Sequence, residues 1–434
     1  MKRYTSYRLK RARKKLKITQ KDLAGERFKR QYISMIETGE TELSYVAREY
    51  ITKKLKLPKS YFDTGLFKEE KEELNILTKE AEKLIKMQFF KKAEDKVLKA
   101  LEISKEAKNN DYINSFLLKL AIINMEKEDK DLKKAEDILG KVNRYYQEEK
   151  EFKNLAYSYY WTGVLHMKRQ NYTDAVYMYS SSIEENHKLR RKKDLSLEAR
   201  ATSKIAQIYR EIENYRGARQ KYKEAIKLAE KAKDDYVLGM TYWGYGLLLR
   251  RLGEYEKAKD FYEKSLSIHE KLKDEKSLIK LNNNIANVCF YIGDYYKVIL
   301  LTKNTIKISE EKNYNEQLAY ALLFRAKAER EKNLLDKAES DIKRSIKLLK
   351  KIKDKRELGV AYMTQGLIYE RKKEYDLAIT SFNKAIDIFK DLDELVFINS
   401  AYSEIIRFYK DIGGLDKVSE SMEKLINLIK RIKF

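Results

Sequence analysis

The chain has 434 residues, of which 43% are hydrophobic and 37% charged, with one proline, 15 glycines and a net charge of +25 at pH 7. This composition excludes wholesale disorder, and the length predicts two folding units or one elongated array. The scarcity of proline and glycine indicates an all-α protein, because helix interiors exclude proline and penalise glycine.

The positive charge is concentrated at the N-terminus. Residues 1–65 contain 18 Lys or Arg and 7 Asp or Glu, a net charge of +11, and are several-fold more basic per residue than the rest of the chain. Such a density predicts a module that binds phosphates. A membrane surface is the alternative, but the segment lacks the one-sided apolar helix that such binding needs.

Capping and turn signals divide this basic segment into short helices. A basic amphipathic helix comes first, and a second begins after an N-cap at Thr19, with Asp22 in the capping-box position. The turn GERF then precedes a helix over about residues 29–37, which Gly39 closes. A further helix ends before Pro58, and we expect Leu23, Ala24, Ile33 and Ile36 to form the buried seam between the second and third helices.

These residues resemble the phage-repressor type of helix-turn-helix, in which T-Q-x-x-L-A precedes a recognition helix that ends in I-S-x-I-E-x-G. The matching positions are Thr19, Gln20, Leu23 and Ala24, followed by Ile33, Ser34, Ile36, Glu37 and Gly39. The resemblance implies that residues 1–65 are a DNA-binding domain whose recognition helix inserts its start into the major groove. It also implies a homodimer on double-stranded DNA with a two-fold site.

The resemblance also assigns roles within the domain. Arg30 suits guanine and Gln31 suits adenine, and Glu37 is expected to be a structural acceptor rather than a DNA contact. The candidate DNA-binding residues are Gln20, Lys29, Arg30, Gln31, Tyr32 and Ser34, with Lys14, Lys15 and Lys17 as further phosphate contacts.

A repeat runs through residues 66–434. The segments GEYEKAKDFYEKSL, GDYYKVILLTKNTI and KEYDLAITSFNKAI each place an aromatic residue three positions before a small one. The small position recurs at spacings of 40 to 43 residues, at Ala93, Ala135, Ala175, Ala218, Ala258, Val298, Ala338, Ala378 and Val418. A second small position lies twelve residues earlier in most units and fails at Ile123 and Ile406. The register predicts about nine helix pairs that pack closely.

The register resembles the tetratricopeptide repeat, which carries Gly or Ala on its first helix and Ala on its second. Here the period exceeds the usual value of about 34 residues, and the closing proline is missing. Longer helices or longer connections are therefore expected. The resemblance implies an α-solenoid with a concave face that binds something extended.

First-helix positions of this solenoid supply candidate ligand contacts. Asn amides pair with peptide N–H and C=O groups, and Arg binds carboxylates bidentately. The candidate peptide-binding residues are Arg200, Gln207, Arg210, Trp243, Arg250, Asn283, Asn284, Asn287 and Lys327, and Tyr160, Ser203, Phe290, Tyr320 and Arg330 are also expected to face the groove. The run LNNNIANVCFY needs an explanation because Asn is a poor helix former. Its asparagines either contact a ligand or form solvated helix surface with one capping residue.

The sequence offers no enzymatic chemistry. His166, His187 and His269 have no partners at metal-ligand spacing, and no phosphate-binding glycine loop or nucleophile motif is found. Cys289 is the single cysteine and lies in an apolar stretch, so we expect a core residue. No signal peptide or membrane-spanning run is found. We predict a cytoplasmic protein that is not an enzyme and has no cofactor, no metal and no membrane contact.

A phage-repressor-like head joined to tetratricopeptide-like units resembles the peptide-responsive regulators of Gram-positive bacteria, the RRNPP group. The resemblance implies a transcriptional regulator whose repeat domain senses a short signalling peptide in quorum sensing and controls DNA binding by the dimeric heads. Two alternatives stay open. One is a scaffold whose groove docks a folded partner such as a response regulator, and the other is a repressor that needs no peptide.

Overall fold

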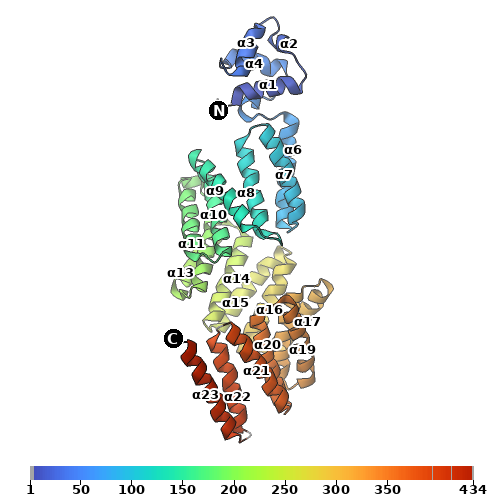
Figure 1. Cartoon of the computed structure of the whole chain (residues 1–434), viewed down its shortest axis with the longest axis vertical. Helices are drawn as coiled ribbons and strands as arrows, with labels where there is room; N and C mark the ends of the chain where they lie inside the picture. The colour runs from blue at the N-terminus through green and yellow to red at the C-terminus, as the bar shows by residue number, and fades with distance from the viewer. Residues whose placement is uncertain (1–3, 393, 412, 433–434) are drawn as a thin grey trace. The chain divides into compact units, whose positions relative to one another are not determined.

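The computed structural model describes residues 4–392, 394–411 and 413–432, and every regular element in these ranges is helical (Figure 1). The predicted all-α class is therefore confirmed. Contacts divide the chain into two compact units, residues 1–201 and 202–434. The first unit contains both the basic segment and the first helix pairs, so the division at residues 65 and 66 stays a prediction. None of the described helices has the length and apolar character that crossing a membrane requires.

The head at the start of the first unit contains, among the residues from 4 onward that the structure describes, the helices α1 (Thr5–Lys15), α2 (Gln20–Ala24), α3 (Arg30–Thr38), α4 (Tyr45–Lys54) and α5 (Tyr61–Thr64). The Thr19 side chain accepts a hydrogen bond from the Asp22 N–H, and the Asp22 carboxylate completes the predicted capping box. Gly39 ends α3 in the left-handed conformation with φ of 87°. The predicted seam is also confirmed, because all four of its residues are buried.

Within the described residues, nine helix pairs follow the head, as predicted. Those of the first unit are α6 (Lys68–Lys86), α7 (Phe90–Glu106), α8 (Asn110–Glu126), α9 (Leu132–Glu148), α10 (Phe152–Lys168) and α11 (Tyr172–His187), then a 3-10 turn (Arg190–Lys192) and the first residues of α12 (Leu195–Glu211). The second unit continues with α13 (Tyr215–Ala232), α14 (Asp235–Arg251), α15 (Tyr255–Lys271), α16 (Glu275–Ile292), α17 (Tyr295–Glu311), α18 (Asn315–Glu331), α19 (Leu335–Ile352), α20 (Lys355–Arg371), α21 (Tyr375–Asp391), α22 (Leu395–Asp411) and α23 (Leu415–Ile432).

In several helix pairs a small residue on the first helix faces a large ring on the second and allows close packing. A Cβ added to Gly246 would lie 2.6 Å from the ring of Tyr262, and one added to Gly366 would lie 2.5 Å from the ring of Phe382. Both rings are fully buried. The small residue is thus required by its neighbour, which explains the register of the sequence.

Longer helices, rather than long connections, account for the long repeat. The helices α14 and α15 each have 17 residues, and three residues separate them. An aspartate takes the place of the missing proline at several of the joints. Asp234, Asp274 and Asp354 accept hydrogen bonds from backbone N–H groups in the first turns of α14, α16 and α20.

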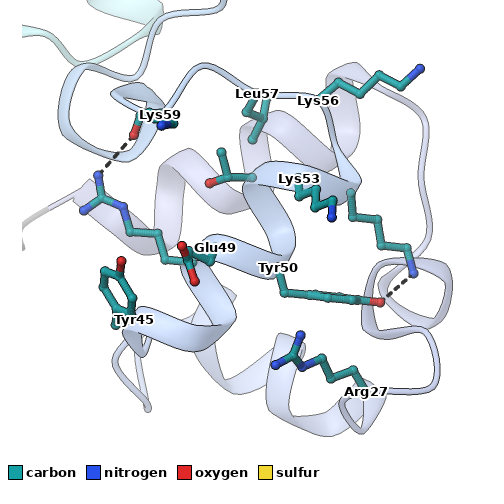
Figure 2. A pocket seen from close by; sticks show the side chains of 11 residues that line it. Arg27, Tyr45, Glu49, Tyr50, Lys53, Lys56, Leu57 and Lys59 are labelled. Carbon is teal, nitrogen blue, oxygen red and sulfur yellow. Dashed lines mark hydrogen bonds between the residues drawn. The ribbon is translucent and has the colours of Figure 1, made fainter.

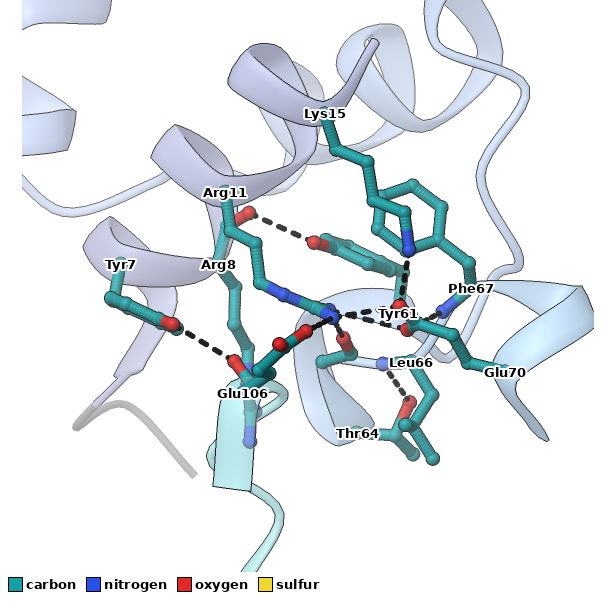
Figure 3. A network of polar contacts seen from close by, with 11 residues as sticks. Tyr7, Arg8, Arg11, Lys15, Tyr61, Thr64, Leu66, Phe67, Glu70 and Glu106 are labelled. Carbon is teal, nitrogen blue, oxygen red and sulfur yellow. Dashed lines mark hydrogen bonds and ion pairs between the residues drawn. The ribbon is translucent and has the colours of Figure 1, made fainter. Parts of the chain in front are cut away.

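Hydrogen bonds attach the head to the first repeats (Figure 3). The buried Arg8 donates from Nη1 to the carbonyl oxygen of Phe62 at 2.8 Å and from Nη2 to that of Lys108 at 2.9 Å. The Tyr7 hydroxyl donates to the carbonyl oxygen of Glu106 at 2.9 Å. Side chains of α1 therefore bind the backbone at the end of α5 and in the turn between α7 and α8.

Candidate nucleic-acid and ligand interfaces

The start of α3 presents three of the predicted DNA-binding residues to solvent. Lys29 is the N-cap of α3, and Arg30 and Gln31 follow it; all three are exposed. Tyr32 is more tied to the head, because its ring stacks on Phe28 with 5.2 Å between centroids. Exposed donors at a helix N-terminus, where the helix dipole favours anions, suit contact with nucleic acid.

Glu37 has the structural role that the sequence predicts. Its carboxylate accepts from Arg13 Nε at 2.7 Å, from Arg13 Nη2 at 2.9 Å and from Gln20 Nε2 at 3.0 Å. Burial alone would raise the pKa of Glu37, but the hydrogen bonds from Arg13 and Gln20 hold it below its usual value. Gln20, which was expected to contact phosphate, uses its amide nitrogen within the head. Ser34 is half-buried one turn earlier on α3.

A hollow of about 1160 Å³ opens on the head beside α4 (Figure 2). Its lining carries six cations and one carboxylate, namely Arg27, Arg48, Lys53, Lys54, Lys56, Lys59 and Glu49. Asp63 pairs with Arg48, and Lys54 Nζ donates to Tyr50 Oη at 3.0 Å. The amino-acid composition of the head predicts its positive charge. It does not predict this hollow, because α4 and the turn before α3 are separated in the sequence and come together only in the folded structure.

The candidate ligand residues of the second unit lie on the first helices of its pairs. These helices contact one another, α16 with α18 and α18 with α20. Two rows of equivalent repeat positions run across them, Gln207, Asn287 and Lys327 in one and Arg210, Arg250, Phe290 and Arg330 in the other, and all of these side chains are half-buried. Arg200 belongs to the first unit and is not placed with them.

The side chain of Asn283 is buried between α16 and α18 rather than exposed on a groove. Its side chain is 3% exposed, and Nδ2 donates to Gln317 at 3.0 Å (backbone O) and 3.2 Å (Oε1). The amide therefore joins α16 to α18, because this side of α16 packs against the next first helix. Asn284 is half-buried, and Asn287 Oδ1 accepts from Arg250 Nη1 at 3.5 Å, so a ligand role for these two stays a prediction.

Cys289 is a buried core residue, as expected, and burial raises the pKa of its thiol to about 11. Across the described residues, no group of three or more His, Cys, Asp or Glu is placed to hold a metal ion.

Models of the tetratricopeptide repeat match residues 237–301 and 360–391. No curated protein matches the sequence. Among solved structures, the apo form of the quorum sensor NprR from B. thuringiensis is 16% identical with a TM-score of 0.58, over 83% of this chain and 98% of that chain. A Rap protein complexed with competence and sporulation factor is 19% identical with a TM-score of 0.55, over 83% of this chain and 99% of that chain.

A further similar structure is a signal-transduction ATPase with a tetratricopeptide repeat sensor from Pyrococcus horikoshii. It is 14% identical with a TM-score of 0.58, over 100% of this chain and 64% of that chain. At these identities the likeness establishes the fold, a tetratricopeptide-like α-solenoid, and the predicted fold class is confirmed.

Proposed function

We propose that the chain is a DNA-binding transcriptional regulator of the RRNPP type. It acts in the cytoplasm as a homodimer, without enzymatic activity, and its repeat domain binds a short signalling peptide that controls DNA binding by the heads. One observation carries the proposal. A single chain joins a basic head, with Lys29, Arg30 and Gln31 exposed at a helix start, to a solenoid with donors on its first helices.

The head supports the DNA-binding half of the proposal. The exposed start of α3 offers Arg30 for guanine and Gln31 for adenine, and both can form bidentate hydrogen bonds to base edges. The cations of the hollow beside α4 add sequence-independent attraction to phosphates. Sequence reading and positioning are thereby divided between two adjacent surfaces of the head.

The repeat domain supports the sensing half of the proposal. Solved structures of the same fold include a quorum sensor and a Rap protein bound to competence and sporulation factor. A peptide changes DNA binding only if its affinity differs between two states of the solenoid. Since each helix pair contacts mainly its neighbours, small changes at each joint add up along the array.

Selection of bound sequences from a random duplex DNA library tests the proposal with the full-length chain. We expect a two-fold symmetric sequence motif, and we expect Arg30→Ala and Gln31→Ala each to weaken binding to it by about 1–3 kcal/mol and to relax the preference at one base pair. Lys99→Ala is the matched control, because Lys99 is an exposed cation of α7 that pairs with Glu73 at 2.7 Å. An unchanged motif and affinity in both head variants would refute the assignment of α3 as the recognition helix.

A further inference from the structure

Among the described residues, Arg250 on α14 and Lys327 on α18 have no carboxylate partner. Within the described residues, Lys327 on α18 forms no ion pair, and its Nζ lies 6.0 Å from the centroid of the Phe290 ring and 5.8 Å from that of Phe324. Arg250 on α14 contacts Asn287 at 3.5 Å, and its Nε is buried without an acceptor.

The equivalent arginines of the neighbouring pairs show that this lack is local. Arg210 pairs with Glu211 at 2.6 Å, and Arg330 pairs with Glu331. Each of these cations therefore has its own carboxylate from the adjacent residue of the chain. The residue after Arg250 is Arg251, which binds Glu213 at 3.0 Å, so α14 supplies positive charge at this position and no compensation for it.

Arg250 and Lys327 lie on either side of one stretch of α16. Asn287 and Phe290 lie about one turn apart on that helix, with Arg250 in contact with the first and Lys327 over the second. On α14, Trp243 lies two turns before Arg250, and its buried Nε1 also has no acceptor among the described residues. Donors and rings thus predominate here, and a ligand that satisfies them must bring acceptor oxygens.

The charge of Lys327 is sensitive to what binds beside it. Burial lowers the pKa of Lys327 to about 8, with Arg330 and Arg250 acting in the same direction and Glu357 at the start of α20 opposing them. A bound anion would stabilise the ammonium and raise this pKa. Binding above about pH 8 would then be accompanied by proton uptake.

We propose that the inner face formed by α14, α16 and α18 binds an acidic peptide, and that a carboxylate of this peptide lies between Arg250 and Lys327. This inference rests on the proposed peptide-sensing function and adds the chemical class of the peptide. The carboxylate forms charge-assisted hydrogen bonds with Arg250 and an ion pair with Lys327, while Phe290 and Trp243 contact the neighbouring apolar part of the peptide.

A heptapeptide library, incubated with the full-length chain and read by mass spectrometry of the retained peptides, tests the inference. One pool has amidated C-termini and the other has free C-termini. Enrichment of Asp and Glu in the amidated pool supports a side-chain carboxylate in the site, and retention confined to the free pool supports a C-terminal carboxylate. Equal retention of acidic, neutral and basic peptides in both pools overturns the inference but leaves peptide sensing intact, whereas no retention at all overturns both.

Variants connect this preference to the two cations. We expect Lys327→Met and Arg250→Met to lower the affinity of the best retained acidic peptide at least tenfold, about 1.4 kcal/mol. Lys307→Met is the control, because Lys307 is an exposed lysine of α17, the second helix of its pair. This variant should bind the peptide with the affinity of the wild type. Lys327→Met should also keep or raise Tm, because it removes an unpartnered half-buried charge. A lower Tm with unchanged peptide preference would assign Lys327 a structural role and overturn the inference.

Proton uptake provides a measurement that does not depend on the fold of the variants. Calorimetric titration of the retained peptide near pH 8.5, in two buffers of different ionisation enthalpy, should show uptake of protons by the wild type. Binding without proton exchange would remove Lys327 from the site.

Discussion

The guanidinium of Arg11 on α1 binds the carboxylate of Glu70 on α6 through hydrogen bonds of 2.7 and 3.3 Å. Lys15 pairs with the same carboxylate, which also accepts the N–H of Phe67 at 3.1 Å (Figure 3). The side chains of Arg11 and Glu70 are 10% and 11% exposed. The pair joins the first helix of the head to the first helix of the repeats and fixes the position of one on the other.

Glu70→Gln is expected to weaken this attachment by about 2–4 kcal/mol of unfolding free energy, because it removes the carboxylate that Arg11 and Lys15 share and leaves Arg11 only the more distant Glu106 at 3.7 Å. Urea unfolding at neutral pH measures the loss. Burial would raise the pKa of Glu70, but Lys15 and Arg11 hold it below its usual value. Its stabilisation is therefore present at neutral pH and is lost as the pH falls through the folded-state pKa.

Glu73→Gln on the same helix is the matched control for this change. Glu73 pairs with Lys99 at 2.7 Å, and both side chains are exposed, so its loss should cost less than about 1 kcal/mol. Equal costs for the two substitutions would contradict a buried attachment at Glu70.

Gly65→Ala is expected to separate the head from the repeats. Gly65 has φ of +73°, and an added Cβ would lie 2.1 Å from the carbonyl oxygen of Ala107, which is backbone and cannot move aside. Next to it, Asn109 Nδ2 donates to the carbonyl oxygen of Thr64 at 2.8 Å. We expect a loss of about 3 kcal/mol or more and faster proteolysis between the head and α6.

Gly253→Ala is the control that distinguishes the effect of the steric clash at Gly65 from the effect of backbone strain alone. Gly253 has φ of +74° but open space around its Cα, so an alanine there meets only the strain of the left-handed conformation, about 1 kcal/mol. The two variants are compared by Tm under identical conditions. A similar decrease in both would mean that the contact between Gly65 and Ala107 does not constrain the head.

The sequence predicts those features that repeat or that follow local rules. The register from Ala93 to Val418 indicates nine helix pairs because close packing of two helices favours a small residue at a recurring position. Thr19 and Gly39 mark helix ends because capping depends on neighbours in the chain. These elements need no knowledge of the tertiary structure.

The sequence does not predict contacts between residues that are far apart in the chain. The Arg11–Glu70 pair connects residues 59 positions apart and belongs to no repeat. Asn283 fits the sequence pattern of a groove residue, but its side-chain amide donates a hydrogen bond to Gln317. The repeat pattern does not specify how closely two neighbouring first helices approach each other. The contrast between Arg250, which has no carboxylate partner among the described residues, and Arg330, which pairs with Glu331, likewise requires the side-chain positions.

Lys53→Ala and Lys56→Ala are expected to weaken binding to all DNA sequences alike. Both lysines line the hollow beside α4, and counterions released by phosphate contacts make such binding depend on salt. The slope of log affinity against log salt concentration should decrease by about 1 for each lysine, with the selected motif unchanged. An altered motif would assign these lysines to base reading, and an unchanged slope would remove them from the DNA surface.

His269 makes the stability of the second unit depend on pH. Its side chain on α15 is fully buried, and Nδ1 lies 3.2 Å from Asp274 Oδ2. Burial lowers the pKa of His269, and Asp274 only partly opposes this. Because the unfolded chain takes up the proton more readily, the unfolding free energy should fall as the pH drops below the unfolded-state pKa of about 6.5. Unfolding in urea at a series of pH values measures this fall.

His269→Gln tests whether this residue is responsible. The variant should lose about 1–3 kcal/mol at neutral pH because a buried side chain is replaced, but its unfolding free energy should fall less steeply on acidification. His187→Gln is the control, because the His187 side chain is half exposed and belongs to the first unit. A pH dependence that is identical in wild type and His269→Gln would show that other groups titrate on unfolding, since only the variant lacks the buried imidazole.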